Sequence, residues 1–361
     1  MRRTFLFAGF LLLATILAAA QQKEKRLRVT PLPVIYYSPE TKLGFGALVA
    51  ANFETVSVPD SVTLTSFAQT YFLYTVNKQY DWGTKVRVYS PQNKFIFNGR
   101  FNYTYFPEYY FGIATEDPES KKDTIEYFNV LGDVRFFWQL QKKYYLGFAT
   151  RFNRISKVNS GESGSLLVDK PLGYQDYWIQ GFAPAFMIET RDSFVYPRKG
   201  FYLEAMYYFY PSWNGGSYNF QSVKLDVRKY FPVTWISEID ALAFQFLANI
   251  NTGDVPFKDM ADIGGAFTMR GYYKGYYRYN NLYAFQAEYR TNIWRRLGLV
   301  AWLGAAVTAE KWYGFAENPV KPNAGIGLRI MFNKKDKLNV RLDQGFGKNQ
   351  QGFYLDLAEA F

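Results

Sequence analysis

GFYLDLAEAF, residues 352–361, alternates apolar side chains with small or polar ones. The predicted apolar face of this strand carries Phe353, Leu355, Leu357 and Phe361. Outer-membrane β-barrels finish on such a strand, and its apolar side chains would then form the terminal signal for assembly. The last strand of a soluble sheet would show the same pattern. This segment alone therefore leaves both fold classes open.

The N-terminal sequence favours a membrane protein over a soluble one. Arg2 and Arg3 precede an apolar run, residues 5–19, which ends at a small-residue cleavage site before Gln21. This pattern predicts a secretory signal peptide over residues 1–20. No later apolar run reaches the roughly 18 residues of a transmembrane helix. A mature chain that enters a membrane must then form a closed barrel, which pairs every backbone polar group between strands.

Composition agrees with a barrel. Aromatic residues make up 20% of the chain although its mean hydropathy is only −0.23, and a barrel uses such residues in its two interfacial girdles. The net charge of +11 is spread through strands and turns rather than gathered in a patch. We interpret it as lining of the lumen and as contacts with anionic lipid headgroups, which argues against a nucleic-acid partner.

The chain contains no His and no Cys. Their absence excludes Ser-His and Cys-His nucleophiles, disulfides and nearly all transition-metal sites. Neither a Gly-x-Ser-x-Gly elbow nor a P-loop is present, and no pair of carboxylates stands out. We therefore predict no enzyme, no cofactor, no metal site and no small-molecule substrate.

Turn signals divide residues 21–361 into about sixteen strands, although fourteen remain possible because strand boundaries are uncertain by a few residues. Residues 21–27 are too few for a periplasmic domain, so we predict one barrel domain with both ends in the periplasm. The long connections then fall outside the cell: residues 107–123, 157–173, 251–279 and 311–322.

The longest connection contains paired glycines followed by a lone cation between Met and Gly. The motif comprises Gly264, Gly265, Met269, Arg270, Gly271 and Tyr272. We expect this loop to fold into the lumen, where Arg270 pairs with an inward carboxylate. From strand parity, Glu288 and Asp343 are the candidates. The alternative, of equal weight on physical grounds, is a solvated surface Arg.

A second cluster, residues 191–200, is predicted at an inner turn. Its motif residues are Asp192, Pro197 and Gly200, and the Pro and Gly supply turn geometry. A stable turn with no further role would have the same sequence.

At these two clusters the chain resembles the bacterial surface antigen family, which includes outer-membrane assembly factors and two-partner secretion transporters. The likeness extends to residues 31–41, 287–290 and 341–345 and to the terminal strand. It departs from the family in two ways. Residues 21–27 leave no room for the POTRA domains that receive clients, and residues 299–306 lack the acid that the family tends to carry there.

The resemblance implies an outer-membrane barrel that assembles or translocates proteins through a weak seam between its first and last strands. Its partners would be outer-membrane lipid and client polypeptides or other envelope proteins. Pro31 and Pro33 lack backbone donors in the first strand, and Gly352 has no side chain to pack, so we expect few ladder bonds at this seam. A passive pore and a structural membrane anchor of a larger complex are the alternatives.

Overall fold

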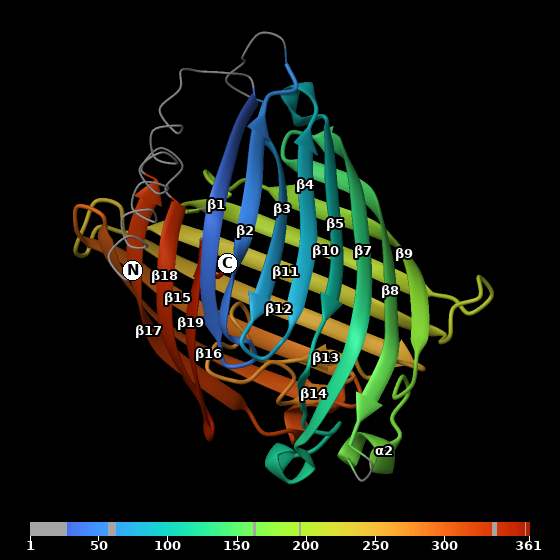
Figure 1. Ribbon diagram of the computed structural model, residues 1–361. Helices are drawn as coiled ribbons and strands as arrows, with labels where there is room; N and C mark the ends of the chain where they lie inside the picture. Colours follow the sequence, from blue (N-terminus) through green and yellow to red (C-terminus); the bar gives the residue numbers. More distant parts are fainter. Residues whose placement is uncertain (1–26, 57–62, 162–163, 195, 334–337, 358) are drawn as a thin grey trace, which may run out of the picture.

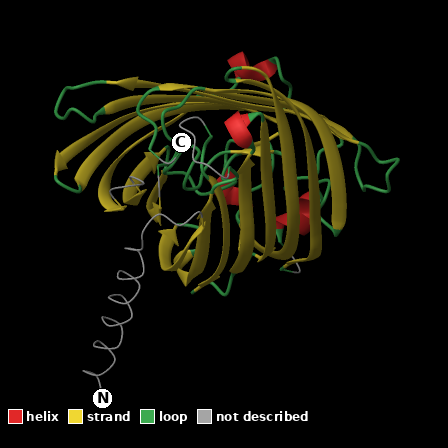
Figure 2. Ribbon diagram, turned by 90° about the horizontal axis from the view of Figure 1, so that it is seen from above, coloured by secondary structure: helices red, strands yellow, loops and turns green. Residues whose placement is uncertain are grey.

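The computed structural model describes residues 27–361 except 57–62, 162–163, 195, 334–337 and 358. The predicted signal peptide, residues 1–20, lies outside the described residues. No helix in the described part of the chain is long and apolar enough to cross a membrane. The strands curve around a common axis in Figure 1 and form a ring when the barrel is viewed from above in Figure 2.

Sixteen long antiparallel strands close the barrel, as predicted, within the described residues. The first eight are β1 (Leu27–Ser38), β2 (Lys42–Phe53), β3 (Ser66–Thr75), β4 (Tyr80–Tyr89), β5 (Phe95–Tyr105), β7 (Asp123–Gln141), β8 (Tyr144–Ser160) and β9 (Tyr177–Glu189). The other eight are β10 (Gly200–Tyr210), β11 (Phe220–Pro232), β12 (Ala241–Gly253), β15 (Asn281–Trp294), β16 (Leu297–Ala309), β17 (Lys321–Asn333), β18 (Leu338–Gly347) and β19 (Gln350–Leu357). Neighbours in sequence pair with each other, and β1 pairs with β19 to close the sheet.

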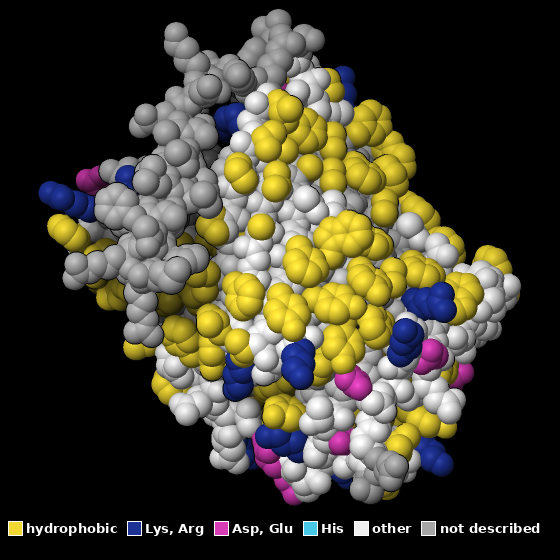
Figure 3. Space-filling model, viewed as in Figure 1, with side chains coloured by type: hydrophobic (Ala, Val, Ile, Leu, Met, Phe, Trp, Pro, Cys, Tyr) yellow, Lys and Arg dark blue, Asp and Glu magenta, His cyan; other side chains and the backbone are white. Residues whose placement is uncertain are grey.

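Most strands have an apolar, exposed outer face and a less exposed inner face. In β16, Leu299 and Leu303 are exposed while Val300 and Trp302 between them are buried. This alternation follows from the two-residue period of a strand, and it repeats around the barrel. Figure 3 shows hydrophobic side chains across much of the strand surface, with charged ones gathered toward the end that carries α2 (Ser165–Asp169). The outer surface is therefore suited to lipid.

The two ends of the barrel differ in their connections. One end, here called the loop end, carries the connections of residues 106–122, 161–176, 254–280 and 310–320. Three short strands lie in these connections, namely β6 (Glu108–Tyr110), β13 (Ala261–Asp262) and β14 (Arg278–Tyr279). The other end, the turn end, has connections as short as residues 142–143 and 295–296. The four predicted long connections thus share one end of the barrel.

The predicted bounds of the last strand, residues 352–361, are wrong at the C-terminal end. β19 stops at Leu357, and Phe361 is only 4% exposed instead of lying on the lipid face with Phe353. The physical reason is Glu359. In an unbroken strand Glu359 would have the same parity as Leu357 and would carry a charge into lipid. Instead, Glu359 pairs with Arg329 inside the barrel.

Candidate functional site

The loop between β12 and β15 depends on glycine at its closest contacts. Gly264 has a φ of +107°, and a Cβ there would lie 2.1 Å from the carbonyl oxygen of Tyr273. Gly271 has a φ of +116°, and its Cβ would lie 2.6 Å from the backbone nitrogen of Phe346 in β18. Gly265 is also left-handed, with a φ of +89°. Only glycine permits both this backbone conformation and this approach of the loop to a barrel strand.

Arg270 is fully buried between two strands of the barrel wall. Its Nη1 lies 2.6 Å from Asp343 Oδ2 on β18, and its Nη2 donates to Glu288 on β15. The guanidinium also lies over the ring of Trp302 on β16, 3.7 Å from the centroid. Charge-assisted pairs and a stacked aromatic ring both suit a planar guanidinium. The structure thus brings Arg270 together with both carboxylates predicted from the sequence. Trp302 belongs to residues 299–306, the segment that lacks the acid expected from the family resemblance.

The neighbours of Arg270 in the motif are fastened to the wall as well. The backbone N–H of Met269 donates to Gln286 Oε1 at 2.9 Å. The hydroxyl of Tyr272 donates to the carbonyl oxygen of Pro322 at 2.8 Å. Lys348 N, in the connection between β18 and β19, donates in turn to the Tyr272 hydroxyl at 2.9 Å. The motif is therefore held on β15, β17 and the β18–β19 hairpin at once.

Further arginines extend the ion network toward the turn end. Asp343 also accepts from Arg329 Nη1 at 2.5 Å and from Arg341 Nη1 at 3.3 Å. Glu288 accepts from Arg290 Nε at 2.6 Å. All of these groups are nearly or fully buried, and buried charges persist only when they are paired in this way.

The turn motif meets this network through Arg290. Asp192 Oδ1 accepts from the backbone N–H groups of Arg198 and Lys199 at 2.9 and 3.3 Å, which fixes the turn. Gly200 has a φ of +113°, and a Cβ there would lie 2.3 Å from the carbonyl oxygen of Thr190. The carbonyl oxygen of Pro197 accepts from Arg290 Nη1 at 3.5 Å. The two predicted clusters therefore meet in one network, since Glu288 binds both Arg270 and Arg290, and Arg290 contacts the turn motif.

A second anchor of the loop was not predicted from the sequence. Lys258 pairs with Glu108 of β6. Burial lowers the pKa of Lys258 to about 8, although the attraction of the Glu108 carboxylate acts in the opposite direction. Asp259 accepts from Asn153 Nδ2 on β8 at 3.0 Å and from the Tyr177 hydroxyl on β9 at 2.8 Å. Lys258 and Asp259 are adjacent in the same loop but lie outside its glycine motif. Their partners are far away in sequence, so no local pattern marks them.

The same loop contacts both sides of the β1–β19 seam. Glu40, in the turn between β1 and β2, accepts from the backbone N–H of Lys274 at 2.7 Å. Burial raises the pKa of the Glu40 carboxyl. On the other side of the seam, the hydroxyl of Tyr354 in β19 accepts from Gly271 N at 3.0 Å and donates to the carbonyl oxygen of Tyr272 at 3.2 Å. The loop therefore bridges the first hairpin and the last strand.

A closed antiparallel barrel with an apolar outside, a charged lumen and a loop arginine held on strand carboxylates belongs to the class of outer-membrane β-barrels. More specifically, a family model described as the Omp85 superfamily domain matches residues 44–348. The chain belongs to this superfamily.

Solved structures agree on the fold. CdiB from Escherichia coli matches 93% of this chain and 63% of its own, with a TM-score of 0.63 and 9% identity. BamA from Haemophilus ducreyi, lacking POTRA domains 1–3, matches 93% of this chain and 71% of its own, with a TM-score of 0.57 and 12% identity. CdiB from Acinetobacter baumannii matches 93% and 60%, with a TM-score of 0.55 and 8% identity. A search of the curated proteins found no significant match.

Proposed function

We propose that this barrel assembles or translocates polypeptides at the outer membrane, and that its β1–β19 seam opens sideways to pass or template a client strand. The pairing at the seam carries the proposal. All twelve residues of β1 pair with β2, and all eight residues of β19 pair with β18. Between β1 and β19, in contrast, the register contains one residue pair, Tyr37 with Leu355.

A short ladder has two consequences for function. Fewer hydrogen bonds must break, so the opening free energy is lower here than between fully paired strands. Among the described residues, the part of β1 beyond this pair has no partner in β19, and unpaired backbone groups of a strand edge are what a client strand needs for β-augmentation. Membership of the Omp85 superfamily and the fold shared with BamA and CdiB support this function.

The anchoring of the long loop weighs against a passive pore. Arg270 binds the β15 and β18 wall, while Asp259 binds the β8 and β9 wall. A loop held on two walls obstructs the lumen between them, and free diffusion requires an open channel.

The test is a disulfide across the seam. Tyr37→Cys and Leu355→Cys replace directly opposed residues, and the chain contains no native Cys. Oxidation should abolish assembly or secretion of envelope proteins in cells that depend on this barrel, and reduction should restore it. The matched control is Ile35→Cys with Phe45→Cys, opposed residues of the fully paired β1–β2 ladder, which should leave function unchanged. Full activity of the oxidised seam variant would refute lateral opening.

A further inference from the structure

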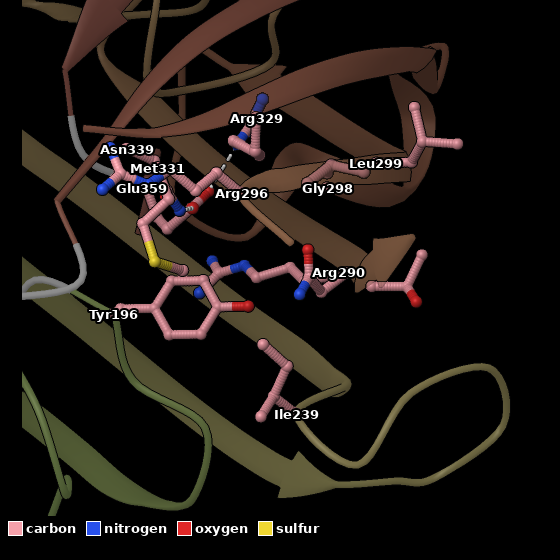
Figure 4. A pocket seen from close by; sticks show the side chains of 13 residues that line it. Tyr196, Ile239, Arg290, Arg296, Gly298, Leu299, Arg329, Met331, Asn339 and Glu359 are labelled. Atoms are coloured by element: carbon pink, nitrogen blue, oxygen red, sulfur yellow. Dashed lines mark hydrogen bonds and ion pairs between the residues drawn. The ribbon is translucent and has the colours of Figure 1, made fainter. Parts of the chain in front are cut away.

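A buried pocket lies at the turn end of the lumen, and residues 359–361 occupy it. Arg329 Nε lies 2.8 Å from Glu359 Oε2, and Asn339 Nδ2 donates to Glu359 Oε1 at 2.7 Å. Figure 4 shows Glu359 beside Arg329 and Asn339, with Tyr196 and Arg290 in the same pocket. One carboxylate thus meets a cation and an amide from two adjacent strands, a geometry that selects for an acidic side chain.

Phe361 is recognised separately in the same region. Its carbonyl oxygen accepts from Arg290 Nη2 at 2.7 Å, and the Arg290 guanidinium lies 5.5 Å from the centre of its ring. The ring packs in a buried cluster with Tyr230 and Ala243. Ala360 is buried in this cluster too. The site therefore recognises an acid, a small residue and an aromatic residue in that order.

The site has binding capacity that this segment does not use. Arg329 Nη2 and Asn339 Oδ1 are buried and have no hydrogen-bond partner among the described residues. The space left beside Glu359 has a volume of only about 10 Å³, comparable to one water molecule. If Glu359 left, the one carboxylate that would still pair with Arg329 among the described residues is Asp343, which Arg270 and Arg341 already share. Because an unneutralised buried charge is costly, the site favours exchange of one acidic segment for another.

We propose that this turn-end pocket is a peptide-binding site for segments that carry an acid two residues before an aromatic residue, and that Glu359–Phe361 is its exchangeable internal occupant. The occupant begins two residues beyond the end of β19, one of the two seam strands, and the described ladder of β19 ends at Leu357. An incoming segment of the same pattern displaces it and neutralises Arg329 in its place. The identity of the incoming segment as part of a client rests on the proposed function, whereas the site itself does not.

The experiment uses a fluorescent peptide with the sequence of residues 355–361 and the purified barrel in detergent. The double variant Glu359→Ala with Phe361→Ala weakens the internal occupant, so it should bind the peptide about tenfold more tightly than the wild type. Replacing Glu by Gln in the peptide, or Arg329 by Ala in that variant, should remove the gain. Arg228→Ala, which breaks a comparable Arg–Asp pair on β11, is the matched control and should preserve binding.

A second measurement covers variants that fail to fold. The substitutions Ala243→Cys and Ala360→Cys, within one buried cluster, should lock the occupant in place when oxidised, blocking the peptide until the protein is reduced. Equal binding to wild type and double variant, or binding that ignores both Arg329 and the lock, would overturn the proposal. A functional barrel with a cross-linked seam would refute lateral opening but would leave this binding result intact.

Discussion

Arg270 joins parts of the chain that are far apart in sequence. It contacts Glu288, 18 residues away, and Asp343, 73 residues away, without exposing any of its own surface. Trp302 beneath the guanidinium keeps the cation in a flat slot. A lysine could not occupy this slot in the same way, because its ammonium is a compact charge that cannot bridge two carboxylates as a planar fork does.

Arg270→Ala should lower the free energy of unfolding by about 3 to 5 kcal/mol, because it leaves two buried carboxylates without their shared partner. Arg270→Lys should retain only part of this stability. Equilibrium unfolding in urea from lipid vesicles measures the change. The control is Lys121→Ala, which removes a partly exposed ion pair with Asp169 and should change stability by less than about 1 kcal/mol. Equal effects of Arg270→Ala and Lys121→Ala would contradict a buried role for Arg270.

At the scale of elements, the long loop acts across the seam as well as within the lumen. Lys274 binds the β1–β2 turn through Glu40, and Gly271 and Tyr272 bind β19 through Tyr354. The weak ladder is thus supplemented by hydrogen bonds from a third element. Separation of β1 from β19 requires at least one of these loop contacts to break.

Tyr354→Phe should therefore make the seam easier to open. The variant loses the hydroxyl that serves two loop residues, at about 1 kcal/mol per net hydrogen bond. Amide hydrogen exchange in β1 should accelerate about fivefold for each bond lost, or about thirtyfold for both. Glu40→Ala should act in the same direction, with a smaller effect for Glu40→Gln. Tyr71→Phe is the control, since its hydroxyl serves Asp81 and Asn102 on the β3–β5 wall. No difference in β1 exchange between the two Tyr→Phe variants would rule out a loop contribution.

The strands and the candidate partners of Arg270 were accessible from sequence because a two-residue period assigns every strand residue to a face. Parity alone limits the inward carboxylates near the motif to Glu288 and Asp343. Lys258 and Asp259 were missed because their partners lie on β6, β8 and β9, and loop residues have no parity. The end of β19 was also predicted wrongly, although a charged residue on the apolar face, Glu359, indicates that the strand stops before it.

At the scale of the whole molecule, the long loop extends across the lumen and is held on two sides of the barrel wall. One anchor, Asp259, lies on the β8–β9 side, and the other, Arg270, lies on the β15–β18 side. Because the loop is held on both sides, we expect these two anchors to limit how much of the lumen is open to ions.

The double variant Lys258→Ala with Asp259→Ala should raise the single-channel conductance in planar bilayers by about twofold or more, since it frees the loop from one wall while Arg270 remains bound. Arg228→Ala is the control, because it changes lumen charge without touching the loop. An unchanged conductance in the double variant would show that this anchor does not restrict the lumen.

The sharing of Asp343 among arginines also has a consequence for the order of events during biogenesis. Arg270 precedes its partner Asp343 by 73 residues, and Asp343 lies on β18, the second-to-last strand, so the loop cannot take its final place until the sheet is nearly complete. Contacts between residues so distant in sequence form slowly, because chain entropy must be lost before they contribute. We therefore expect docking of the loop to be a late step of maturation, so that in a barrel that fails to close, proteases can still cut the loop.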